Sequence, residues 1–160
     1  MQGYGAELIL TPGEEGMGGA IKLAKELAEK NGYFLPMQFD NPANALIHEQ
    51  TTGQEILQAF GAKLPDAFVA GVGTGGTLTG VGRALRAKKA DIQVYALEPS
   101  ESPVLKEGKK GKHKIQGISA GFVPSILDTK LYTWGQDQFS AVALHQFTPF
   151  DTHRFWHRDQ

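Results

Sequence analysis

The chain has 160 residues, of which 41% are hydrophobic and 21% are charged, and its formal net charge at pH 7 is −1. These values are typical of a globular chain, and a charge so close to zero gives no support for binding to nucleic acid or to an anionic membrane. The sequence contains no cysteine, which excludes disulfides and a thiolate nucleophile. Because no apolar run reaches the length of a membrane span and residues 1–7 do not resemble a signal peptide, we expect a cytoplasmic protein.

In the first 36 residues the sequence predicts a helix between two short strands. From Ala20 to Lys30, apolar side chains recur every three or four residues and charged side chains fill the other positions, which is typical of an amphipathic helix. Gly32 follows, and glycine commonly ends helices. The segments Glu7–Leu10 and Tyr33–Pro36 have the length and apolar composition of strands.

Helices and strands alternate after this region. Asn41 and Pro42 suit the start of one helix, and Thr51–Gly53 suit the start of a second. This alternation predicts an α/β fold with a parallel sheet and flanking helices. The second helix continues through Glu55–Phe60. The remaining predicted elements are a strand at Ala67–Val72, a helix at Leu78–Lys89 and a strand at Ile92–Leu97.

Five lysines lie close together after the last predicted strand. The run contains glycines but neither arginine nor aromatic side chains, so it has no means of reading bases. The run therefore predicts a solvated loop and no nucleic-acid site. The lysines are Lys106, Lys109, Lys110, Lys112 and Lys114.

A glycine- and threonine-rich loop, residues 73–77, joins the strand at Ala67–Val72 to the following helix. In such a connection the backbone N–H groups and the helix N-terminus converge where an anion would bind. A phosphate monoester would also find the hydroxyls of Thr74 and Thr77. A tight turn that needs glycine for its backbone conformation is a simpler explanation of the same loop.

A second interpretation of the loop is a dinucleotide site. Gly71, Gly73 and Gly76 match the G-x-G-x-x-G fingerprint, and Glu98 follows the next strand, where a ribose-binding acid belongs. An ATP- or GTP-binding P-loop is excluded, because no Gly-Lys-Ser/Thr follows.

Several segments, in this order, together resemble cysteine synthase (O-acetylserine sulfhydrylase), of the β family of pyridoxal-phosphate enzymes. Collinear matches are more specific than any single motif among them. The segments are residues 4–10, Gly16-Met17 with Gly19-Ala20, Gln38-Phe39, Asn41-Pro42, Thr51-Thr-Gly53 with Glu55-Ile56, residues 73–80, Glu98-Pro99, residues 114–118 and Ala120-Gly-Phe122.

The resemblance implies a cofactor, a reaction and site residues. Family enzymes make L-cysteine and acetate from O-acetyl-L-serine and sulfide, through an aminoacrylate bound to pyridoxal 5′-phosphate. Gln38 matches the glutamine beside the substrate carboxylate, Gly117 matches a glycine at the active-site opening, and Glu98 has no ribose role. The cofactor phosphate would lie on Gly73, Thr74, Gly75, Gly76 and Thr77.

The resemblance also implies a homodimer, a serine acetyltransferase partner and a lysine that forms the Schiff base. None of the 12 lysines here lies in the family's lysine segment, so no catalytic residue is assigned and we expect a truncated, inactive copy. The alternatives are a non-catalytic remnant that binds phosphate or a partner, and a nucleotide-binding domain.

The same comparison predicts how the chain is divided. Residues 1–36 would be a remnant of a small N-terminal domain, residues 37–132 part of a large cofactor-binding domain, and residues 133–160 an out-of-frame tail outside the family. His153 and His157 in that tail have the spacing of metal ligands but lack a third ligand, so we assign no metal site.

Overall fold

The computed structural model describes residues 2–132; the predicted tail, with His153 and His157, lies outside the described residues. A parallel pair of strands and five helices follow two short 3-10 turns in the described part. In chain order they are η1 (Gln2–Tyr4), η2 (Gly13–Glu15), α1 (Gly16–Asn31), α2 (Ala43–Gln50), α3 (Thr52–Phe60), β1 (Ala67–Gly71), α4 (Gly76–Lys88), β2 (Gln93–Leu97) and α5 (Val104–Glu107).

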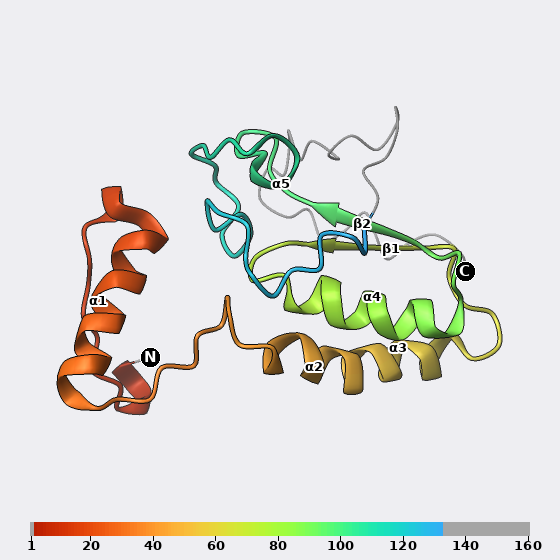
Figure 1. Cartoon of the computed structure of the whole chain (residues 1–160), viewed down its shortest axis with the longest axis horizontal. Coiled ribbons are helices and arrows are strands. Elements are labelled where there is room, and N and C mark those ends of the chain that lie inside the picture. The colour runs from red at the N-terminus through yellow and green to blue at the C-terminus, as the bar shows by residue number, and fades with distance from the viewer. Residues whose placement is uncertain (1, 133–160) are drawn as a thin grey trace.

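Helix α4 is the middle of three layers. Figure 1 shows the two strands on one side of α4, and α2 and α3 on the other. The strands are parallel, with Ala67 opposite Gln93 and Gly71 opposite Leu97. A parallel pair needs a crossover between its strands, and α4 is that crossover. The predicted α/β fold with a parallel sheet is therefore confirmed.

The sequence of α4 gives it two different faces. Leu78, Val81 and Leu85 are almost fully buried and belong to the core beneath the sheet. On the opposite face, Gly80 admits the backbone of α2, because a β-carbon there would collide with the carbonyl oxygen of Ala45. The other buried residues of the core cluster are Val72, Ile92, Val94, Leu127 and Tyr132.

Helix α2 begins where the sequence predicts. The Ala43 N–H donates to the Asn41 side-chain oxygen at 3.0 Å, so Asn41 satisfies one of the amides that a helix start leaves unpaired. Pro42 directly precedes the first helical residue, and because proline has no backbone N–H it leaves no unpaired donor there.

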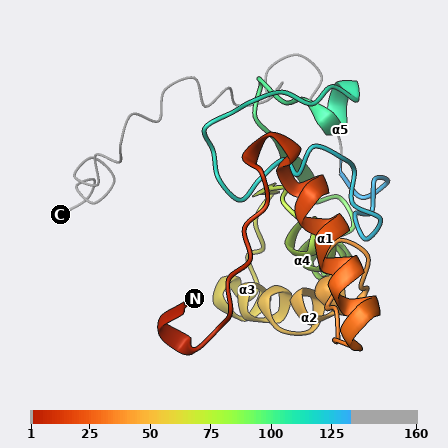
Figure 2. The same ribbon diagram turned by 90° about the vertical axis from the view of Figure 1, so that its left-hand side faces the viewer.

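Helix α1 stands apart from the three layers in Figure 1, and in Figure 2 it lies in front of them. It ends at Gly32, whose φ of +70° is left-handed, as a glycine after a helix commonly is. None of its residues is buried against the described part of the chain.

The two strands predicted beside α1 are wrong. Neither Glu7–Leu10 nor Tyr33–Pro36 belongs to a strand, and the sheet of the described residues consists of β1 and β2. A strand exists only where a neighbour pairs with its backbone, and no such neighbour lies beside these segments within residues 2–132. Leu10 and Phe34 are accordingly 80% and 86% exposed.

Candidate functional site

A cleft of about 890 Å³ lies where the glycine loop enters α4. The loop before α2, the loop at residues 117–122 and the start of α1 form its other walls. Four of the residues predicted for the site line it together: Gln38, Gly73, Thr74 and Gly117.

The glycine loop presents backbone amides at the start of a helix. Gly75 is the residue before α4 and has a left-handed φ of +86°, which a side chain would disfavour. The first N–H groups of α4 have no partner within the helix, and they carry the positive end of its dipole. Gly75 and Gly76 are buried, whereas Thr77 is exposed.

Two loop glycines are required by close neighbours. A β-carbon on Gly73 would collide with the carbonyl oxygen of Gly117, and one on Gly76 would collide with the Asn44 side chain. The loop is therefore pressed against both the 117–122 loop and α2. This bare backbone, with two threonine hydroxyls beside it, fits a phosphate monoester.

Both threonine hydroxyls are bonded to α2. Thr74 Oγ1 accepts hydrogen bonds from Asn44 Nδ2 at 3.0 Å and from the Gly76 N–H at 3.4 Å. Thr77 Oγ1 lies 3.2 Å from His48 Nε2, and the other ring nitrogen of His48 lies 2.9 Å from Thr52 Oγ1. Sequence reasoning missed Asn44 and His48. Their spacing of one helical turn was visible, but not that this helix packs on α4.

The 117–122 loop is fastened to the end of β1. The Ser119 N–H donates to the carbonyl oxygen of Val72 at 2.8 Å. The Ser119 hydroxyl donates to Ser102 Oγ at 2.9 Å, and Ser102 Oγ also accepts from the Gly111 N–H at 3.1 Å. Ser102 and Ser119 both line the cleft, and neither was predicted.

The lysine run is solvated, as predicted. All five of its side chains are exposed. Lys110 and Lys112 nevertheless line the cleft, as do Glu14 and Glu15 of η2.

Glu98 has a structural task that conflicts with a ribose-binding role. The residue is 4% exposed, and its carboxylate accepts hydrogen bonds from the N–H groups of Leu105 at 2.7 Å and Lys106 at 2.9 Å. These bonds cap the start of α5 and occupy both carboxylate oxygens. The position of Glu98 counts against the dinucleotide interpretation.

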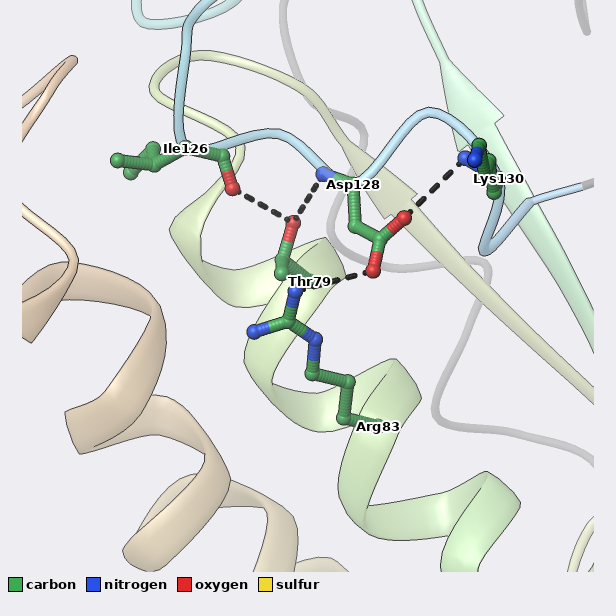
Figure 3. A network of polar contacts seen from close by, with 5 residues as sticks. All are labelled: Thr79, Arg83, Ile126, Asp128 and Lys130. Carbon is green, nitrogen blue, oxygen red and sulfur yellow. Dashed lines mark hydrogen bonds and ion pairs between the residues drawn. The ribbon is translucent and has the colours of Figure 1, made fainter.

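A polar network behind the loop holds the last described segment on α4 (Figure 3). Buried Thr79 Oγ1 donates to the Ile126 carbonyl at 3.3 Å and accepts from the Asp128 N–H at 3.1 Å. Arg83 lies one turn further along α4 and pairs with the Asp128 carboxylate at 3.0 Å. The network keeps Leu127 against Gly75, where a β-carbon would lie 2.9 Å from that of Leu127.

Residues 2–132 contain neither a candidate metal-ion cluster nor a candidate membrane-spanning helix. No group of three or more His, Cys, Asp or Glu side chains there could hold a metal ion. No helix in the same residues is long and apolar enough to cross a membrane.

Comparison with known proteins agrees with this geometry. Curated cysteine synthases of several Staphylococcus aureus strains are 58% identical over 132 residues, which is 82% of this chain and 43% of the relative. Among solved structures, an O-ureido-L-serine synthase is 48% identical with a TM-score of 0.78, over 82% of this chain and 42% of that one. The cysteine synthase of Entamoeba histolytica is 42% identical with a TM-score of 0.75, over 82% and 39%.

The resemblance to cysteine synthases is thus confirmed, although the chain spans less than half the length of the curated relatives it matches. A family model described as "Pyridoxal-phosphate dependent enzyme" matches residues 1–147. The chain belongs to this family of pyridoxal-phosphate dependent enzymes.

Proposed function

We propose that this chain supplies the phosphate-binding part of the active site of a cysteine synthase. The observation that carries the proposal is the glycine loop: Gly73 and Thr74 line the cleft together with Gln38 and Gly117, and α4 begins two residues later at Gly76. The loop belongs to a chain 58% identical over 132 residues to curated cysteine synthases.

Each predicted residue has a task in this proposal. The backbone of residues 73–77 and the hydroxyls of Thr74 and Thr77 bind the cofactor phosphate. Gln38 lies beside the substrate carboxylate, and Gly117 leaves the entrance open. When bound, pyridoxal phosphate supplies a ring that withdraws electrons from the substrate, while the chain's own residues bind and orient it.

The proposed substrates are O-acetyl-L-serine and sulfide, which give L-cysteine and acetate. Relatives with other second substrates share this fold, including an O-acetylserine dependent cystathionine β-synthase from Helicobacter pylori at 41% identity. The higher identity to the Staphylococcus aureus cysteine synthases favours sulfide.

Assembly, compartment and domain division are part of the same proposal. A homodimer, a serine acetyltransferase partner and a cytoplasmic location follow from the family assignment. The division at residues 36 and 132 into a small-domain segment, a cofactor-domain segment and a tail rests instead on the segments that resemble cysteine synthase, since the family model extends to residue 147. All of these stay predictions.

The 160-residue polypeptide by itself should bind the phosphate without catalysis. None of its 12 lysines lies in the family's lysine segment, so the residue that would attach the cofactor and move the substrate proton has no counterpart in it. We expect no cysteine from O-acetyl-L-serine and sulfide with this polypeptide alone. Turnover measured by cysteine formation would contradict this expectation.

Thermal unfolding with ligands tests the phosphate site. Pyridoxal phosphate and inorganic phosphate should each raise the midpoint of unfolding, and NAD should not, because ligands that bind only the folded state stabilise it. Thr77→Val keeps the shape but removes a donor to a charged group, so the apparent Kd for phosphate should rise about tenfold. Thr129→Val, at an exposed threonine outside the glycine loop, is the matched control.

A different pattern would favour a nucleotide site. Stabilisation by NAD that Glu98→Ala removes, without a response to phosphate, would support the dinucleotide interpretation and overturn the proposed function.

A further inference from the structure

Two side chains of α2 each contact a hydroxyl of the glycine loop, residues 73–77, which is the proposed phosphate loop. Asn44 and His48 are one helical turn apart, so both project from the same face of α2. Asn44 contacts Thr74 and His48 contacts Thr77. Gly76 makes room for Asn44, because any side chain at that position would displace it.

The orientation of the Asn44 amide follows from its second partner. Asn44 Nδ2 also donates to the backbone carbonyl oxygen of Gln38 at 2.9 Å, and a carbonyl oxygen only accepts. The NH₂ group therefore faces both Gln38 and Thr74, and both of its hydrogens are used. This amide ties the proposed substrate-binding segment to the phosphate loop.

The hydrogen bonds around Thr74 determine what its hydroxyl can do. Its oxygen receives hydrogens from Asn44 and from the Gly76 N–H, which occupies its two lone pairs. The hydroxyl hydrogen remains for another acceptor. Since Thr74 lines the cleft, an anion bound there is a suitable acceptor.

His48 controls Thr77 through its tautomer. If Nε2 carries the hydrogen, it donates to Thr77 Oγ1, and the Thr77 hydroxyl is left to donate to an anion. If Nδ1 carries the hydrogen instead, it donates to Thr52 Oγ1, and Thr77 must spend its hydroxyl hydrogen on Nε2. The two tautomers therefore give one donor more or one donor fewer at the loop.

We infer that Asn44 and His48 are positioning residues that make the Thr74 and Thr77 hydroxyls donors to the cofactor phosphate. This inference rests on the proposed function. Asn44 acts by filling the acceptor sites of Thr74, and His48 acts in the tautomer with hydrogen on Nε2.

A matched pair of substitutions at His48 tests the inference in the full chain. The longer amide of His48→Gln can replace Nε2 and donate to Thr77, whereas the shorter amide of His48→Asn replaces Nδ1 and reaches only Thr52. With inorganic phosphate as the probe in thermal unfolding, His48→Gln should keep an apparent Kd within about twofold of the original. His48→Asn should raise it about tenfold, the usual effect of losing a hydrogen bond to a charged group. In the Thr77→Val background, His48→Asn should have no further effect.

Asn44→Leu, of similar size but without a donor, should also weaken phosphate binding about tenfold.

Nitrogen NMR of the His48 ring gives a readout independent of affinity. With phosphate bound, Nε2 should carry the hydrogen and Nδ1 should be the acceptor. A merely structural role would lower the unfolding midpoint of both His48 variants without separating their responses to phosphate.

The outcomes separate the two proposals. A parent chain that does not respond to phosphate overturns the proposed function and this inference with it. If the parent responds and Thr77→Val weakens the response, equal responses from His48→Asn and His48→Gln overturn only the inference. A His48 ring that carries its hydrogen on Nδ1 alone in the phosphate complex would also overturn only the inference.

Discussion

Within residues 2–132, two residues other than glycine have left-handed backbone conformations, and both belong to the cleft region. Met37 and Ser119 each have a φ of 53°. Met37 precedes Gln38 in a tight turn, in which its carbonyl oxygen accepts from the N–H groups of Asp40 and Asn41 at 2.8 and 2.7 Å. Such conformations cost of order 1–3 kcal/mol and persist where surrounding contacts hold them. Met37 is next to Gln38, and Ser119 lines the cleft together with Gln38 and Gly117.

Tyr132 provides a residue-scale test of the core. Burial, and secondarily the negative charge of Glu98, raise the pKa of the Tyr132 phenol. Because the folded state holds this proton more tightly than the unfolded chain, the stability linked to it is complete below the ordinary pKa of about 10. That stability is lost as the pH rises through the raised folded value. Absorbance titration should show a tyrosine step above the ordinary pKa of about 10 that belongs to Tyr132.

Tyr132→Phe is the control for this titration. It should remove the last step and flatten the alkaline decline in stability. If Tyr132→Phe instead lowers the amplitude of the step near pH 10 and leaves the last step intact, Tyr132 ionises like an exposed tyrosine.

At the scale of elements, α4 joins the core to the site. One face packs under the sheet through Leu78, Val81 and Leu85. The other face carries Gly80, and the absence of a side chain there lets α2 come close to α4. Side chains of α2 can therefore reach the phosphate loop. The distance between the two helices is therefore a property on which the site depends.

Gly80→Ala should disturb both stability and the site. The new methyl group would meet the backbone of α2, and overpacking of this kind costs about 1–3 kcal/mol. We also expect weaker protection by phosphate, since α2 carries Asn44 and His48. The measurements are urea unfolding and the phosphate-induced shift of the unfolding midpoint.

Gly18→Ala on another helix is the matched control for urea unfolding only, because Gly18 lies in the wall of the cleft. Gly18 lies in α1 with open space around it, so alanine there should stabilise the chain by roughly 0.5–1 kcal/mol. Equal effects of the two substitutions would show that α2 and α4 are not closely packed.

On the scale of the whole molecule, the described residues divide into a packed part and an exposed part. The core cluster draws on β1, α4, β2 and the segment near Leu127 and Tyr132. Helix α1 buries none of its residues against the described chain, and the apolar residues on either side of it, Leu10 and Phe34 among them, are largely exposed. Local stability follows buried contacts, so the two parts should open with different free energies.

Hydrogen exchange followed by mass spectrometry measures this difference. Amides of α4 and β2 should exchange most slowly, near the limit of global unfolding. Amides of α1 should exchange much faster, through local opening. Leu85→Ala should cost about 2–5 kcal/mol, whereas Leu23→Ala on α1 should cost far less. Slow exchange in α1, at the rate of α4, would show that the helix is packed in solution.

The sequence by itself determined the four longer helices, α1 to α4, the parallel pair of strands and the glycine loop between them, but not the short helix α5. These features depend on local patterns. Apolar spacing predicts α4, Asn41 and Pro42 predict the start of α2, and glycines between a strand and a helix predict an anion-binding turn. The collinear segments also identified the family, because their order along the chain can be recognised without coordinates.

Only the tertiary structure decided which residues stand behind the loop and which predicted strands form. Asn44 and His48 meet Thr74 and Thr77 because α2 crosses α4 at Gly80, and a contact between distant segments has no local signal. Glu98 resembled a ribose ligand in the sequence, but the fold places two amides of α5 on its carboxylate. Glu7–Leu10 has the composition of a strand and forms none, because a strand depends on hydrogen bonds to a neighbour that its own residues cannot supply.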